Sequence, residues 1–188
     1  DGPYTDADQA QVVAFIAALI DRMEGEYNID PARIYVNGLS NGGGMAWWLS
    51  CRLGDRIAAF GTVAGAYLTA WSACQPTRPV PAIVFHGTAD PVVPYDGGPS
   101  DMFNRPFPVI ADWVAELARR NSCDAPPLAL PPQGDASAVQ YPGCDQDAEV
   151  IFYTIDGGGH SWPGGGWLPR FMVGHTSQDV DATRLMWE

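Results

Sequence analysis

The sequence predicts an α/β fold, in which a parallel β-sheet carries helices on both faces. Three observations predict it: short apolar runs rich in β-branched residues, helical apolar periods between them, and polar side chains directly after several of the runs. The chain has 188 residues, of which 46% are hydrophobic, so it can bury a substantial core. Because no repeat or linker divides it, we expect residues 1–188 to form one domain.

The first third of the chain predicts two helices around a short strand. Apolar residues recur at a helical period from residue 12 to residue 23, after an N-terminal capping signal at 5–8. A strand is predicted at 34–36, and a second helix at 41–53 that Gly54 ends. Glycines 42–44 in the first turn of this helix are poor helix formers. They indicate a helix that lies close to neighbouring backbone.

The remaining chain adds strands and one more long helix. Strands are predicted at 57–64, 82–85, 139–141 and 149–155, and a helix at 109–120. The proline-rich stretch 126–133 is predicted to be a loop. Ligands of such sheets bind beyond the carboxyl ends of the strands, so residues that directly follow strands are the candidate site residues.

The most informative motif is Gly38-Leu39-Ser40-Asn41-Gly42, which follows the first predicted strand and opens a helix. A serine on such a strand-to-helix turn is the nucleophile elbow of the α/β-hydrolases, in which a strained turn lifts the hydroxyl clear of the sheet. The fold class is therefore predicted to be α/β-hydrolase-like. The backbone N–H of Asn41, at the start of the helix, is a natural oxyanion donor.

A serine nucleophile needs a base, and a carboxylate must orient that base. His160 follows the last strong strand in a glycine-rich loop, and Asp90 follows the strand at 82–85. The order Ser40, Asp90, His160 matches nucleophile, acid, base. The alternatives are a turn-forming role for Asp90 before Pro91 and a merely structural loop role for His160.

Other candidates carry less chemistry. Asp96 and Asp156 compete for the role of acid, but Asp156 lies too near His160 in sequence to orient its ring easily. We interpret His86 as structural and His175 as a solvated or supporting residue. The three histidines lack the spacing of metal ligands, so neither a metal nor another cofactor is predicted.

Net charge and hydropathy limit the classes of partner, and the cysteines suggest two disulfides. The net charge is −12 with no basic patch, which argues against nucleic acid, and no apolar run is long enough to span a membrane. The simplest pairing of the four cysteines is nearest in sequence, Cys51 with Cys74 and Cys123 with Cys144. Four buried free thiols in a cytosolic protein are the alternative.

With these residues in place, the chain resembles the polyhydroxybutyrate depolymerase and feruloyl esterase group of secreted α/β-hydrolases. The resemblance covers nearly the whole chain and rests on five segments: 28–35, 38–43, 85–95, 158–164 and 181–187. It implies ester hydrolysis through an acyl-serine, with Ser40 as nucleophile, His160 as base and Asp90 as acid. It also implies a secreted protein with disulfides, and a substrate-lining role for Trp162, for which ordinary packing is the alternative.

The sequence departs from this group at its N-terminus. Members carry several strands before the first helix seen here, including a His-Gly loop that supplies the second oxyanion donor. We therefore expect an N-terminally shortened domain with reduced activity and an exposed sheet edge that could pair two copies. A serine peptidase and a non-catalytic carbohydrate- or polymer-binding module are the alternative functions. The acyl and alcohol specificity is not readable from the sequence.

Overall fold

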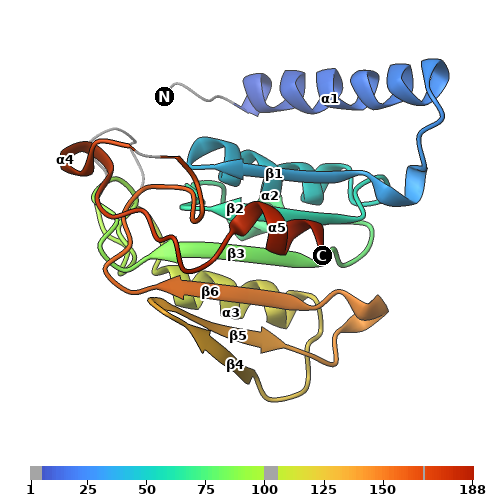
Figure 1. Cartoon of the computed structure of the whole chain (residues 1–188). Helices are drawn as coiled ribbons and strands as arrows, with labels where there is room; N and C mark the ends of the chain where they lie inside the picture. The colour runs from blue at the N-terminus through green and yellow to red at the C-terminus, as the bar shows by residue number, and fades with distance from the viewer. Residues whose placement is uncertain (1–5, 100–105, 167) are drawn as a thin grey trace.

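The computed structural model describes residues 6–99, 106–166 and 168–188. They form a sheet in the order β1-β2-β3-β6-β5-β4 (Figure 1). Neighbours from β1 through β3 to β6 pair parallel, whereas β5 pairs antiparallel with both β6 and β4. The strands are β1 (Tyr35–Leu39), β2 (Ala59–Val63), β3 (Ala82–Gly87), β4 (Leu128–Gln133), β5 (Ala136–Tyr141) and β6 (Val150–Ile155).

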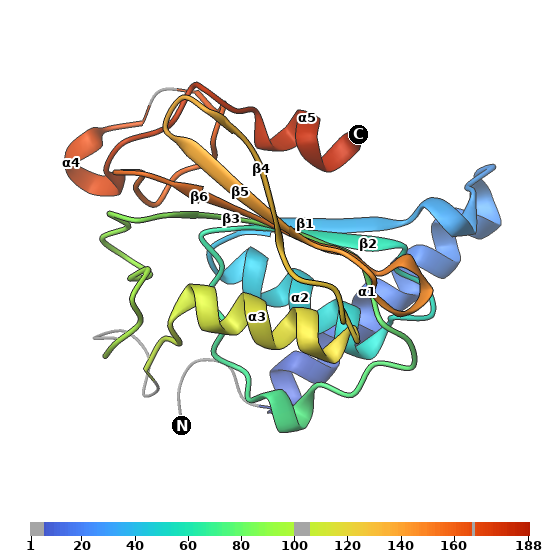
Figure 2. The same cartoon turned by 90° about the horizontal axis from the view of Figure 1, so that it is seen from below.

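Helices cover both faces of the sheet, as predicted (Figure 2). One face carries α1 (Asp6–Glu26), α2 (Asn41–Arg52) and α3 (Ile110–Arg120), and the other carries α5 (Ala182–Trp187). The short helix α4 (Arg170–Val173) lies at the end of the sheet to which the parallel strands point. Of the predicted capping signal at residues 5–8, Thr5 and the neighbouring side chains lie outside the described part.

The stretch 126–133 is not a loop, so this prediction was wrong. Residues Leu128–Gln133 form β4, which pairs with β5, and the register shifts between Leu130 and Gln133, where two prolines interrupt the ladder. Proline cannot donate to a ladder and is tolerated in a strand at a sheet edge or a bulge. Here β4 occupies the edge of the sheet, which is why the prolines do not prevent the strand.

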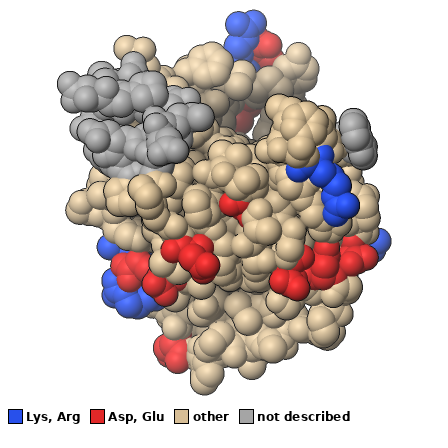
Figure 3. All heavy atoms as spheres, turned by 90° about the vertical axis from the view of Figure 1, so that its left-hand side faces the viewer, with Lys and Arg blue, Asp and Glu red and all other residues tan. Residues whose placement is uncertain are grey.

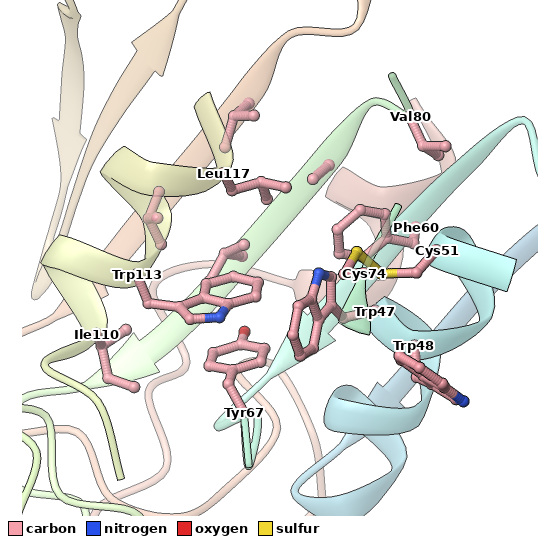
Figure 4. Close-up of a cluster of buried hydrophobic side chains, with 14 of the residues drawn as sticks. Trp47, Trp48, Cys51, Phe60, Tyr67, Cys74, Val80, Ile110, Trp113 and Leu117 are labelled. Carbon is pink, nitrogen blue, oxygen red and sulfur yellow. A yellow bond between two sulfur atoms is a disulfide. The ribbon is translucent and has the colours of Figure 1, made fainter. Parts of the chain in front are cut away.

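An aromatic cluster joins α2, α3 and the chain after β2 (Figure 4). The rings of Tyr67 and Trp113 stack with centroids 3.5 Å apart, and Trp47 meets both edge-on. The Tyr67 hydroxyl is paired with Oγ1 of Thr62, 2.6 Å away on β2. Large aromatic side chains contribute much of the buried area of a core, so this cluster fixes the helices on one face of the sheet.

Both disulfides form with the predicted nearest-in-sequence pairing. Cys51 at the end of α2 is bonded to Cys74, and Cys123 after α3 is bonded to Cys144 before β6. Each bridge therefore ties a helix end to a connection between two strands, Cys74 between β2 and β3 and Cys144 between β5 and β6.

The opposite edge of the described sheet is β1. Its first residue, Tyr35, is 53% exposed. The pairing of two copies at this edge stays a prediction. Within the described residues, no helix combines the length and apolarity needed to cross a bilayer.

Candidate active site

Ser40 lies on a strained turn between β1 and α2. Its backbone has φ 58° and ψ −120°, a conformation that costs free energy for a residue with a side chain. A Cβ atom on Gly38 would lie 2.3 Å from the backbone carbon of Gly42, so the turn requires glycine at position 38. This is the geometry predicted for a nucleophile elbow.

Three glycines at the start of α2 were predicted to let the helix lie close to neighbouring backbone. The structure confirms this for two of them. A Cβ atom on Gly44 would lie 2.3 Å from the carbonyl oxygen of Ala66, and one on Gly43 would lie 3.0 Å from Cα of Gly65. A Cβ atom on Gly42 would meet nothing within 4 Å. The start of α2 thus packs directly against the backbone of residues 65–66, which follow β2.

The elbow also presents a helix N-terminus. Asn41 is the first residue of α2 and is exposed, and the first N–H groups of a helix have no acceptor within it. These N–H groups carry the positive end of the helix dipole. A developing oxyanion beside Ser40 would find donors here.

The side chains of Asp90 and His160 are hydrogen-bonded to each other. Nδ1 of His160 lies 2.9 Å from Oδ2 and 3.1 Å from Oδ1 of Asp90. Oδ1 also accepts from the backbone N–H groups of Val92 and Val93, so the carboxylate is held in one orientation. An ionised carboxylate only accepts, which puts the imidazole proton on Nδ1 and leaves Nε2 free to take one.

His86 lies behind this pair and touches its acid. The ring is 1% exposed, and Nε2 lies 2.9 Å from the carbonyl oxygen of Val93 and 3.6 Å from Oδ2 of Asp90. Burial lowers the pKa of His86, although the hydrogen bond to Val93 and the charge of Asp90 oppose this, so the ring is neutral. His86 was predicted to be structural, and its contact with Asp90 was missed; their four-residue separation across a tight turn was the available signal.

The loops that carry Asp90 and His160 are tied to each other. Ala89 N–H donates to the carbonyl of Gly158, and Gly157 N–H donates to the hydroxyl of Thr88. The competing carboxylate Asp156 accepts from Thr88 at 3.4 Å, whereas Asp90 is the carboxylate that meets the His160 ring. The two loops therefore act as one support for the hydrogen-bonded pair.

Trp162 is engaged by the core rather than free. Its indole N–H donates to Oγ1 of Thr183 on α5 at 3.0 Å, and the ring packs against the core cluster on that face. These contacts fit the packing alternative, and the substrate-lining role of Trp162 stays a prediction. The aromatic side chains of Trp47, Trp48 and Tyr67 are also buried.

The topology brings all three sequence-predicted residues to one edge of the sheet. Ser40 follows β1, Asp90 follows β3 and His160 follows β6, and these strands run parallel (Figure 1). The face at this edge is mostly uncharged, with acidic and basic side chains at its flanks and a small acidic patch near its centre (Figure 3). Within the described part of the chain, no three metal-ligating side chains are grouped together.

The chain is similar to several curated esterases, although no family model matches it. NocK of Nocardia uniformis, an esterase by name, is 34% identical over 95% of this chain and 55% of its own length. Feruloyl esterase B of Piromyces equi is 34% identical over 84% of this chain and 30% of its own, and the bifunctional acetylxylan esterase/xylanase XynS20E of Neocallimastix patriciarum is 37% identical over 78% and 21%. The chain thus spans about half, or less, of the length of these relatives.

A solved structure supports the fold. The crystal structure of a single-substitution variant of SOBER1 from Arabidopsis thaliana matches 85% of this chain and 60% of its own chain, with a TM-score of 0.55 and 16% sequence identity. At this identity the likeness concerns the fold alone. In sequence the chain is similar to proteins named as esterases and feruloyl esterases, and in fold it is similar to SOBER1.

Proposed function

We propose that this chain is a serine carboxylic ester hydrolase that works through an acyl-enzyme. The single observation that carries the proposal is the hydrogen bond between His160 and Asp90 at the sheet edge where the strained Ser40 lies. A Ser-His-Asp arrangement on an elbow of this kind performs acyl transfer in many hydrolases.

In the proposed reaction, Oγ of Ser40 attacks the ester carbonyl while Nε2 of His160 takes its proton. Asp90 stabilises the imidazolium that forms, and the N–H groups at the start of α2 stabilise the oxyanion. The imidazolium then protonates the departing alcohol, which leaves the acyl group on Ser40. Water, deprotonated by His160, attacks the acyl-serine and releases the acid and the free serine.

The substrate class follows from the relatives and from charge. Relatives named as feruloyl esterases and as an acetylxylan esterase favour feruloyl or acetyl esters of plant polysaccharides. The mostly uncharged face at the site, in a chain of net charge −12, suits a neutral ester better than a polyanion. Polyesters such as polyhydroxybutyrate are the second substrate class to test. Two disulfides support an oxidising, extracellular or periplasmic location.

The test compares hydrolysis of p-nitrophenyl acetate and methyl ferulate by the wild-type chain and by Ser40→Ala. We expect turnover that disappears in Ser40→Ala and labelling of Ser40 by a serine-directed phosphonate. Ser122→Ala is the matched control, because Ser122 also has a positive φ of 56° but follows α3, away from the site. A folded wild-type chain that neither turns over esters nor reacts with the phosphonate would instead be a binding module, and faster cleavage of a matched amide would indicate a peptidase.

A further inference from the structure

The loop that carries His160 is rich in glycine. Three glycines, 157–159, precede the histidine, and glycine leaves a backbone free to adopt many conformations. The proposed base nevertheless has to stay aligned with both Asp90 and the substrate. The loop is supported by the turn that carries Asp90 and by a second segment of the chain.

A second segment, residues 173–175, lies alongside this loop in backbone contact. His160 N–H donates to the carbonyl of Val173 at 2.6 Å, and Gly159 N–H donates to the carbonyl of His175 at 2.8 Å. Gly158 and His175 form an isolated parallel bridge. A Cβ atom on Gly159 would lie 2.0 Å from the carbonyl oxygen of Val173, so the backbones meet directly. We call residues 173–175 the strap, and any shift of it moves His160.

The ring of His175 anchors the strap. Its Nδ1 lies 2.8 Å from Nη2 of Arg170, and its Nε2 lies 3.1 Å from Oδ2 of Asp135. A guanidinium group only donates hydrogen bonds, so Nδ1 must accept and the proton must reside on Nε2, where Asp135 accepts it. The ring is thus held from both nitrogens in one tautomer.

Asp135 is itself a fixed point between β4 and β5. Its backbone N–H donates to Oδ2 of Asp179 at 2.9 Å, and its backbone carbonyl accepts from Asp156 N–H at 2.8 Å, just after β6. Its second carboxylate oxygen accepts from the hydroxyl of Ser177, which is 2% exposed. The anchor therefore belongs to the same sheet from which the His160 loop departs.

We propose that His175 is a positioning residue for His160, acting through the strap and held by Asp135 and Arg170. This inference rests on the proposed function, in which His160 is the base. Hydrogen bonds to both ring nitrogens keep the strap in place, and the strap carbonyls keep the His160 backbone in place. A base misplaced by about 1 Å can lose on the order of 100-fold in rate, so such a support can matter without touching the substrate.

The test compares His175→Leu with His175→Gln. Leucine fills the site without hydrogen bonds, whereas the glutamine amide can accept from Arg170 and donate to Asp135. We expect His175→Leu to lower kcat by about 10- to 100-fold with KM nearly unchanged, and His175→Gln to restore most of it. Arg170→Met removes only an exposed partner, so the fold is kept, and it should lower kcat in the same direction by less.

The matched control is Glu24→Leu, which breaks the ion pair with Arg56 on the other side of the molecule. The side chains of that pair are 30% and 23% exposed, against 37% and 21% for His175 and Asp135. Glu24→Leu should leave kcat unchanged. Wild-type kcat in both Arg170→Met and folded His175→Leu would overturn the proposal, and so would an equal loss in His175→Gln and His175→Leu.

A second measurement needs no turnover. The proton between Nδ1 of His160 and Asp90 gives a proton NMR resonance, which should move or broaden in His175→Leu and stay in place in His175→Gln and Glu24→Leu. If the wild-type chain hydrolyses no ester, the proposed function fails, but this resonance still reports on the support of His160. An unmoved resonance in His175→Leu would refute the positioning role.

Discussion

Nδ1 of His160 and Oδ2 of Asp90 lie 2.9 Å apart although 70 residues of chain separate them. Two backbone N–H groups, of Val92 and Val93, hold the other carboxylate oxygen at 2.8 and 2.9 Å. The acid is therefore oriented by its own turn before it meets the histidine. The tautomer of His160 is therefore set by the Asp90 carboxylate, which its own hydrogen bonds hold in a fixed orientation.

Replacing Asp90 with asparagine should lower kcat for a p-nitrophenyl ester by about 10,000-fold, because an amide no longer fixes the tautomer or stabilises the imidazolium. The far-ultraviolet circular dichroism spectrum should stay that of the wild type. Asp156→Asn is the control, since Asp156 contacts Thr88 rather than the His160 ring, and its kcat should stay close to wild type. Equal losses in the two variants would contradict the assignment of Asp90.

Gly38→Ala should destabilise the fold, because the new methyl group would lie 2.3 Å from the backbone of Gly42. Overpacking of this kind costs about 3 kcal/mol, which urea unfolding would measure. Gly42→Ala is the matched control: its methyl group meets nothing within 4 Å, so its free energy of unfolding should change by less than about 1 kcal/mol. Similar losses in both variants would mean that the elbow is not the source of the constraint.

His86 should make the fold sensitive to mild acid. Burial lowers its pKa in the folded chain below the ordinary 6.5, so the unfolded chain binds a proton first as the pH falls. Stability is then fully present above about pH 6.5 and declines as the pH falls towards the folded pKa. The urea midpoint should drop more between pH 7.5 and 5.5 in the wild type than in His86→Gln, in which the amide can still donate to Val93. Parallel drops would remove His86 as the cause.

Removing the bridge between Cys51 and Cys74 by a double serine substitution should lower the free energy of unfolding by about 3 kcal/mol. The loop it closes spans 23 residues, and opening it frees the unfolded chain. Urea unfolding with and without a reducing agent gives the measurement. In the double variant, the reducing agent should lower the free energy of unfolding only by opening the remaining bridge between Cys123 and Cys144.

Short sequence motifs predicted those parts of the candidate site that depend only on residues close together in the chain. The elbow at Ser40 depends on neighbouring glycines and on a strand before a helix, and all of these can be read within a dozen residues. The positions of Asp90 and His160 followed from strand order, because parallel strands end at one edge. The pairing of the cysteines was likewise a nearest-neighbour choice, and it was confirmed.

What the sequence missed depends on contacts across the fold. Prolines at 131 and 132 suggested a loop, but their tolerance in β4 depends on which strand occupies the sheet edge. The contact of His175 with Asp135 joins residues 40 apart, and no pattern links them. Sequence periodicity reports which face an element buries and is silent about which distant side chain it meets.

The placement of β6 beside β3 has a consequence for synthesis on the ribosome. β6 is made last among the strands yet lies inside the sheet, between β3 and β5. A nascent chain that has emerged only as far as the turn after β3, residues 90–93, already contains the serine turn and the carboxylate with its N–H donors, but it lacks His160. Native pairing of β6 closes long loops and is intrinsically slow. The proposed triad would therefore be completed in one late step, when β6 pairs with β3 and β5 and brings His160 to the sheet edge.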